Sequence, residues 1–194
     1  MGTTAGTSDS SKSRYSIWLM PAEENVFGEL QSTINSISSR YSTPSFEPHV
    51  TLIAGISGIE DTVIESTHYL ASRIDRSMVE LGSIGRSREY FRSLFVRVQK
   101  NMEIEMAADL AKEVFERYYT REYTPHLSFM YADMQDSQKD KIIEEYGLVQ
   151  LVRRLGAFTI GKLSLYYTYG RVDDWHRVRE FRLVNPVKEA RSIL

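Results

Sequence analysis

The sequence predicts an α+β protein of two lobes related by a pseudo-twofold axis, with antiparallel sheets that face a central groove and helices on the outside. One observation behind this prediction is that the order strand, helix, loop and strand occurs once in each half of the chain. Another is that the phrase Pro-His-apolar-hydroxyl-apolar recurs in each half, with His49 and His126 77 residues apart. Solenoid repeats are shorter and more numerous, so a unit that occurs twice favours a duplicated domain.

In the first half, an apolar strand ends at Pro21, and apolar side chains then recur at helical spacing, as at Val26, Leu30 and Ile34. A loop rich in Ser, Thr and Pro leads to the strand that carries the first phrase. The elements predicted here are a strand at 15–20, a helix up to about 39, a strand at 49–54, a helix at 59–74, and extended segments at 78–84 and 90–98.

The second half repeats this order, and the same shift of 77 residues places Trp18 on Phe95. A loop rich in Tyr, Thr and Pro again precedes the strand with the second phrase. The predicted elements are a strand at 94–98, a helix at 102–118, a strand at 126–131, a short helix at 137–146, an extended run at 157–168, a turn at 170–174 and a last strand at 177–184.

The domain organisation follows from composition. Residues 1–13 are rich in Ser, Thr and Gly and offer little to bury, which predicts a disordered N-terminal tail. We expect residues 14–185 to form a single bilobal domain and residues 186–194 to form a C-terminal tail. With 42% hydrophobic residues and no apolar run near the roughly 18 that span a bilayer, we expect a soluble protein, cytoplasmic or nuclear, with no membrane partner.

Composition also excludes several classes of site and partner. Cysteine is absent, so disulfides, thiol nucleophiles and thiolate metal sites are excluded. A formal net charge of −2 argues against long duplex nucleic acid as a partner. We expect the protein to act as a monomer.

The two phrases each place an imidazole beside a hydroxyl. They use two of only four histidines and two of only five prolines. Because side chains alternate along a strand, His49 shares a face with Thr51, and His126 shares a face with Ser128. A twofold axis between the lobes would bring both faces to one groove, although each histidine alone could equally be an ordinary edge-strand residue.

Paired histidines suit acid-base catalysis, because a free imidazole titrates near pH 6.5 and one ring can be neutral while the other is charged. Hydroxyls such as those of Thr51 and Ser128 are donors suited to the non-bridging oxygens of a phosphate. This set of groups points to phosphodiester chemistry. Zinc sites usually show three protein ligands, and no HxxxH or HExxH motif occurs. No GxSxG motif of a serine hydrolase occurs either, so we expect no metal and no cofactor.

The two phrases resemble the paired H-x-[ST]-x motifs of the 2H phosphoesterase superfamily, whose fold is LigT-like and bilobal. Segments 15–21, 46–51 and 124–132 are similar to the cyclic phosphodiesterases of plants and yeast. The resemblance implies metal-independent hydrolysis of small cyclic phosphates. The substrates that it implies are ADP-ribose 1″,2″-cyclic phosphate, a by-product of tRNA splicing, and nucleoside 2′,3′-cyclic phosphates.

The resemblance also implies roles for individual residues. His49 and His126 become the catalytic pair, with His126 as base and His49 as acid, and Thr51 and Ser128 become phosphate-binding residues. Tyr131 matches a tyrosine that follows the second motif, but strict alternation would turn it away from His126, so only the end of the strand would bring its hydroxyl to the phosphate.

Some alternatives stay open. Trp18 matches a first-strand tryptophan near the family's site and could stack on a base or ribose, or it could be a core aromatic. The substrate could be a 2′-5′ oligonucleotide or an RNA 3′ end, or the protein could bind nucleotides without turnover. Arg86, Arg88, Arg92 and Arg97 form a basic series in which most members should be solvated, though one could reach a second phosphate.

Overall fold

The computed structural model describes residues 14–117 and 122–183. The predicted tail at 1–13 and the end of the chain from residue 184 lie outside these residues, as do residues 118–121. Within the part that is described, no helix has both the length and the apolar character needed to cross a membrane.

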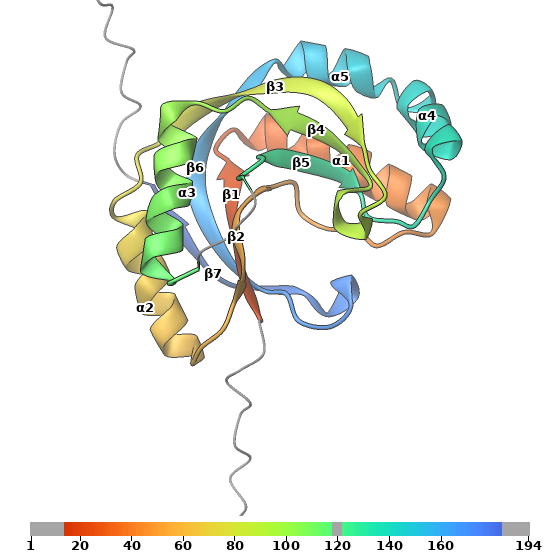
Figure 1. Cartoon of the computed structure of the whole chain (residues 1–194). Helices are drawn as coiled ribbons and strands as arrows, with labels where there is room; N and C mark the ends of the chain where they lie inside the picture. Colours follow the sequence, from red (N-terminus) through yellow and green to blue (C-terminus); the bar gives the residue numbers. More distant parts are fainter. Residues whose placement is uncertain (1–13, 118–121, 184–194) are drawn as a thin grey trace, which may run out of the picture.

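The chain alternates strands and helices in the predicted order (Figure 1). The first half contains β1 (Tyr15–Pro21), α1 (Glu24–Tyr41), β2 (Val50–Ile56), α2 (Glu60–Ala71) and β3 (Ser77–Arg86), followed by the single 3₁₀ turn η1 (Tyr90–Arg92). The second half contains β4 (Leu94–Val98), α3 (Met102–Val114), β5 (His126–Met130), α4 (Asp136–Glu145), α5 (Leu148–Leu155), β6 (Ala157–Tyr167), the 3₁₀ turn η2 (Val172–Asp174) and β7 (His176–Arg182).

All strands join one antiparallel sheet in the order β1-β2-β5-β4-β3-β6-β7, and β6 also pairs with β1. The first half of β6 pairs with β3, while its second half pairs with β7. The sheet therefore curls back on itself, with β1, β2, β6 and β7 in one lobe and β3, β4 and β5 in the other (Figure 1). The predicted α+β class, with two antiparallel lobes, is confirmed.

The duplication is visible in the strand register. Trp18 of β1 lies opposite Thr51 of β2, and Phe95 of β4 lies opposite Ser128 of β5. These two pairs are related by the shift of 77 residues expected from the sequence. The two strand-helix-strand units β1-α1-β2 and β4-α3-β5 are therefore structural copies.

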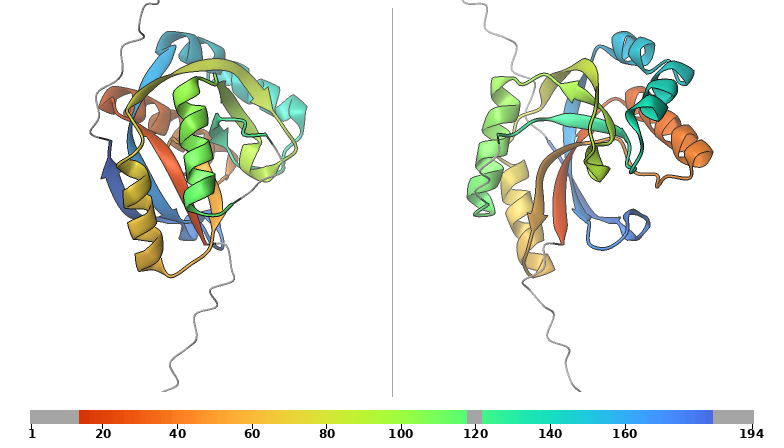
Figure 2. Two further views of the ribbon diagram at one scale, coloured as in Figure 1. Left: turned by 60° about the vertical axis from the view of Figure 1, so that its left-hand side comes forward. Right: turned by 45° about the vertical axis from the view of Figure 1, so that its right-hand side comes forward.

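Helices cover the outer side of each lobe, and the two units exchange them. Helix α1, from the first unit, packs on β5, while α3, from the second unit, packs on β2. Helix α2 joins α3 on the first lobe, and α4 and α5 lie with α1 on the second (Figures 1 and 2). On α1 the buried stripe predicted from the sequence is present at Val26, Leu30, Ile34 and Ile37.

One predicted element is wrong at its start, and one helix was not predicted. The extended segment expected from residue 90 begins instead with η1, and β4 starts at Leu94. The stretch 148–155, for which no element was predicted, forms α5 between Gly147 and Gly156, both of which have positive φ. Helix α3 also ends earlier than expected, at Val114, because Glu116 adopts a left-handed conformation with φ of 49°.

Candidate active site

The two motif strands meet at one point, where Val50 of β2 lies opposite Leu127 of β5. Both of these apolar side chains are fully buried. Their neighbours along each strand, His49 and His126, point to the other side because side chains alternate. The pairing of β2 with β5, one of the two places where strands of the two lobes pair, therefore also brings the two histidines to one face.

Both imidazoles are held in the same way. His49 Nδ1 lies 2.6 Å from the carbonyl oxygen of Glu47, and His126 Nδ1 lies 3.0 Å from that of Thr124. A carbonyl can only accept a hydrogen bond, so each Nδ1 carries the hydrogen and Nε2 of each neutral ring carries a lone pair that can accept a proton. Each accepting residue precedes a proline, which favours the extended backbone that turns this carbonyl toward the ring.

A pocket of about 540 Å³ lies where the two strands meet, and both histidines line it. The hydroxyl-bearing residues Thr51 and Ser128 line it as well. The predicted pairs of imidazole and hydroxyl are thus brought together at one pocket. Ser128 Oγ donates to the carbonyl oxygen of Phe91 at 3.3 Å, which ties this hydroxyl to the wall formed by η1.

Tyr131 also reaches the pocket. Strand β5 ends at Met130, and the backbone N–H of Ala132 then donates to the carbonyl of Tyr90. The end of the strand frees Tyr131 from alternation, and its hydroxyl lies 3.4 Å from Nε2 of His49. Burial raises the pKa of Tyr131, so its phenol keeps the proton and can act as a donor in this site.

Trp18 lies in the site but offers no free ring face. It is buried between the imidazole of His49, with ring centroids 3.5 Å apart, and the ring of Tyr166, at 3.7 Å. Only the edge of the indole remains for the pocket that it lines. In this arrangement Trp18 holds the His49 ring in place, and stacking on a base would require one of these contacts to open.

Three further residues of the pocket wall, Phe91, Trp175 and Glu89, were not singled out from the sequence, whereas Arg92 belongs to the basic series that was. Phe91 and Trp175, from η1 and from the end of η2, stack on each other with centroids 5.5 Å apart. Glu89 and Arg92 stand beside them. The signal available in the sequence was weak, because each of these residues lies in a short turn between polar neighbours.

The pocket disfavours the charged form of both imidazoles in the free protein. Burial and, to a smaller extent, the nearby His126 lower the pKa of His49 to about 3, against the opposing effect of the hydrogen bond to the Glu47 carbonyl. Burial also lowers the pKa of His126, as does the positive charge of Arg92, while the Thr124 carbonyl and Glu89 act in the opposite direction. At neutral pH both rings are therefore neutral until an anion enters.

Charged groups outside the pocket support it. Arg177 of β7 lies 2.5 Å from the Glu47 carboxylate, next to the carbonyl that orients His49.

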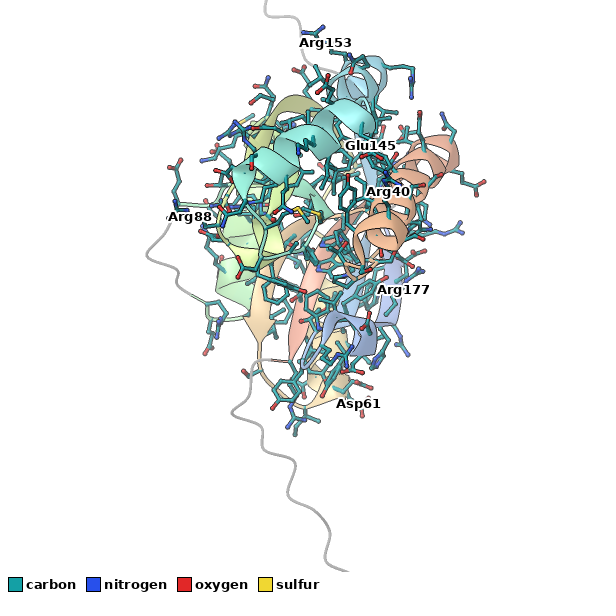
Figure 3. The ribbon with its side chains drawn as sticks, turned by 90° about the vertical axis from the view of Figure 1, so that its right-hand side faces the viewer. Arg40, Asp61, Arg88, Glu145, Arg153 and Arg177 are labelled. Atoms are coloured by element: carbon teal, nitrogen blue, oxygen red, sulfur yellow. The ribbon has the colours of Figure 1, made fainter. Side chains whose placement is uncertain are left out.

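The exposed Arg88 points away from the body of the protein (Figure 3). Arg86 pairs with Asp140, and Arg97 donates to Ser83. In the described ranges, no three His, Cys, Asp or Glu side chains are grouped as a metal site would need.

The fold and the paired motifs define a 2H phosphoesterase. The protein family described as "Cyclic phosphodiesterase-like protein" matches residues 14–183, and the chain belongs to this family. Its membership makes it a phosphoric diester hydrolase that acts on cyclic phosphates, as the sequence predicted.

Two relatives show the extent of the similarity. The cyclic phosphodiesterase of Arabidopsis thaliana is 25% identical over 158 residues, which cover 81% of this chain and 86% of that protein. The 2′,3′-cyclic-nucleotide 3′-phosphodiesterase of Phaeosphaeria nodorum is 25% identical over 189 residues, covering 87% and 98%. Both alignments span most of each protein.

Solved structures share the fold. The apo form of Escherichia coli LigT superimposes with a TM-score of 0.56 at 15% identity, covering 91% of this chain and 100% of LigT. The LigT complex with 3′-AMP gives 0.54 at 12% identity, covering 90% and 99%. The predicted LigT-like bilobal architecture is confirmed.

Proposed function

We propose that the protein hydrolyses ribose-borne cyclic phosphates, namely ADP-ribose 1″,2″-cyclic phosphate and nucleoside 2′,3′-cyclic phosphates, by metal-independent catalysis with two histidines. The observation that carries this proposal is that His49 and His126 line one pocket, each with Nδ1 bound to a carbonyl and Nε2 available. The substrate size also fits, since pockets of about 300–1,000 Å³ hold small ligands and this one measures about 540 Å³.

In the proposed reaction, a water oxygen attacks phosphorus while one imidazole takes a proton from that water. The phosphorus–oxygen bond to one ribose oxygen breaks, and the second imidazole donates its proton to that oxygen. The product is a monoester with a free ribose hydroxyl, and a proton has moved from one ring to the other. Thr51 and Tyr131 would donate hydrogen bonds to the non-bridging oxygens, whose negative charge grows in the transition state, and Ser128 would do so by turning its hydroxyl from the Phe91 carbonyl to the phosphate.

The direction that we propose makes His126 the base and His49 the acid. This direction places the proton on the more buried ring, whose pKa of about 3 in the free protein disfavours the charged form. The bound phosphate supplies the compensation, because a nearby anion raises the pKa of an imidazole. His49 therefore acts as an acid only after substrate has entered.

The similar proteins support a small nucleotide substrate. Relatives carry the name 2′,3′-cyclic-nucleotide 3′-phosphodiesterase, and LigT has been crystallised with 3′-AMP. Since ADP-ribose 1″,2″-cyclic phosphate arises in tRNA splicing, we place the protein in the removal of that by-product.

The test is incubation of the protein with adenosine 2′,3′-cyclic phosphate in excess EDTA, with chromatographic identification of the adenosine monophosphate isomer. We expect full turnover to a single isomer. Binding without turnover would support the module that only holds nucleotides, and turnover restored only by added metal would overturn the two-histidine mechanism.

A further inference from the structure

We propose that Arg92 is a specificity-determining residue that binds a second phosphate, carried on the C5 oxygen of the same ribose that bears the cyclic phosphate. This inference rests on the proposed function, because it concerns which cyclic phosphates the pocket prefers. Arg92 would favour substrates that carry a second phosphate on the C5 oxygen of that ribose over simple nucleoside cyclic phosphates.

The charge distribution of the pocket is the first argument. Among the pocket-lining residues that the structure describes, Arg92 is the only Lys or Arg, and Glu89 is the only carboxylate. Hydroxyl-bearing residues without charge, such as Thr51, Ser128 and Tyr131, line the pocket together with the paired histidines. A substrate with a second anionic group therefore has one complementary group in the pocket, since guanidinium is the side chain best suited to bind phosphate through two donors.

The Arg92 guanidinium has more N–H donors than the structure uses in hydrogen bonds. One Nη2 hydrogen bond reaches Glu89 Oε1 at 3.2 Å, at the exposed edge of the site. Its Nε is buried and has no hydrogen-bond partner among the described residues. The side chain as a whole is 28% exposed, so donors of the guanidinium other than Nε can face a bound phosphate.

The position of Arg92 relative to His126 bears on where a second phosphate would bind. Its guanidinium lies over the Phe95 ring at 5.5 Å, and that ring meets His126 edge-on at 5.4 Å. Arg92 affects the pKa of His126 through its charge. The guanidinium and the His126 imidazole therefore lie against the same aromatic ring and line one pocket, which suits a group one ribose away from the reacting phosphorus.

The backbone that carries Arg92 is fixed from both sides. The Arg92 carbonyl accepts from Ser87 Oγ at 3.0 Å, while the Phe91 carbonyl accepts from Ser128 Oγ. The fully buried Lys139 of α4 donates from Nζ to the Ser87 carbonyl at 2.7 Å. These bonds hold η1 at a fixed distance from β5. The distance between Arg92 and Ser128 therefore favours substrates whose two phosphates have a matching separation.

The second phosphate can come from two sources with shared chemistry. It can be part of a pyrophosphate, as in ADP-ribose 1″,2″-cyclic phosphate, or part of a phosphodiester or monoester at a nucleotide 5′ position. The primary probes are adenosine 2′,3′-cyclic phosphate with and without a 5′-phosphate. ADP-ribose 1″,2″-cyclic phosphate and a dinucleotide ending in a 2′,3′-cyclic phosphate distinguish the two sources.

The experiment compares kcat/KM for the primary probes in wild-type protein, Arg92→Met and Arg97→Met. Arg97 is the matched control, because its guanidinium also lies over Phe95, at 5.8 Å, but the residue does not line the pocket. We expect Arg92→Met to lower kcat/KM for the 5′-phosphorylated probe by about 10- to 100-fold, the range for hydrogen bonds to a charged group. The unphosphorylated probe should lose clearly less, by an amount that reflects the influence of the Arg92 charge on the pKa of His126.

Glu89→Gln provides a gain-of-function test. Removing the carboxylate that pairs with Arg92 should raise kcat/KM for the 5′-phosphorylated probe several-fold, roughly as expected for loss of one repulsive charge at a partly exposed site. The effect should vanish in the Glu89→Gln and Arg92→Met double variant.

The outcomes are distinct. Equal losses on both primary probes in Arg92→Met would show that Arg92 serves the cyclic phosphate or the fold, and would overturn the proposal. No loss on either probe, or an equal loss in Arg97→Met, would overturn it too. A wild-type protein that turns over neither probe would contradict the proposed function instead. Of the two distinguishing probes, the one that loses more activity in Arg92→Met identifies the source of the second phosphate.

Discussion

The indole of Trp18 lies flat on the imidazole of His49, with centroids 3.5 Å apart and an angle of 4° between the planes. At the equivalent position of the second unit, Phe95 meets His126 edge-on, at 5.4 Å and 68°. The duplicated strands have therefore kept their register but changed the aromatic neighbour. His49 is consequently the drier and more firmly held ring, and this asymmetry lets two similar imidazoles differ in protonation.

Trp18→Leu should remove the stacking contact that holds the imidazole of His49 in its position. We expect kcat to fall by about 10- to 100-fold, because small displacements of a catalytic group have effects of this size, while KM changes little. Trp18→Phe, which keeps an aromatic face, should recover most of the rate. A rise in KM with unchanged kcat would instead assign Trp18 to substrate stacking.

The pH dependence of kcat/KM should be displaced to the acid side. The proposed mechanism needs one charged and one neutral ring, and the pKa values of both His49 and His126 are lowered in the free protein. The basic limb should therefore lie below pH 6.5, the usual imidazole value. The basic limb of kcat should lie at higher pH, because bound phosphate raises the pKa of the acid. A basic limb of kcat/KM above pH 7 would contradict this electrostatic account.

The free energy of unfolding should depend on pH because His49 is buried in its neutral form. The folded pKa of His49 is about 3, against about 6.5 in the unfolded chain. Between these values the unfolded chain binds a proton that the folded protein does not, so the free energy of unfolding falls as pH is lowered. His49 can contribute a slope of up to about 1.4 kcal/mol per pH unit.

Denaturant titrations of wild-type protein and His49→Gln from pH 7 to pH 4 would measure this contribution. The wild-type protein should lose stability on acidification faster than His49→Gln. His176→Gln, at an exposed position, controls for the loss of a histidine elsewhere. Parallel curves for wild-type protein and His49→Gln would show that His49 is not buried in its neutral form.

A substrate with sulfur in place of the leaving ribose oxygen distinguishes the acid from the base. A thiolate leaves without a proton because thiols are much stronger acids than ribose hydroxyls, so loss of the catalytic acid no longer matters. We expect this substrate to restore most of the rate in His49→Ala but not in His126→Ala. The reverse pattern would exchange the two roles.

The sequence was sufficient for much of the fold and for the centre of the site. The repeat of two histidine phrases predicted that Trp18 and Phe95 are equivalent, and their strand partners confirm it. The phrases also predicted which four side chains line one pocket. Local patterns were enough because each motif strand depends on alternation and on a proline-preceding carbonyl, both of which are encoded within a few residues.

The missed features depend on tertiary context or on short signals. Helix α5 is only 8 residues long, and its buried residues Leu148, Leu151 and Val152 give a brief helical pattern between two glycines. Phe91 and Trp175 lie 84 residues apart in sequence and meet only through folding. The approach of Tyr131 to His49 depends on where β5 ends, which alternation alone could not predict.

The central claim is that His49 and His126 act as one catalytic unit, and kcat/KM of His49→Ala, His126→Ala and the double variant in EDTA tests it most directly. With the fold verified by circular dichroism, each single variant should lose about 10²- to 10⁴-fold. The double variant should be little worse than the poorer single variant, because groups that act as a unit are not additive. Retention of wild-type activity within about tenfold by either single variant would contradict the account.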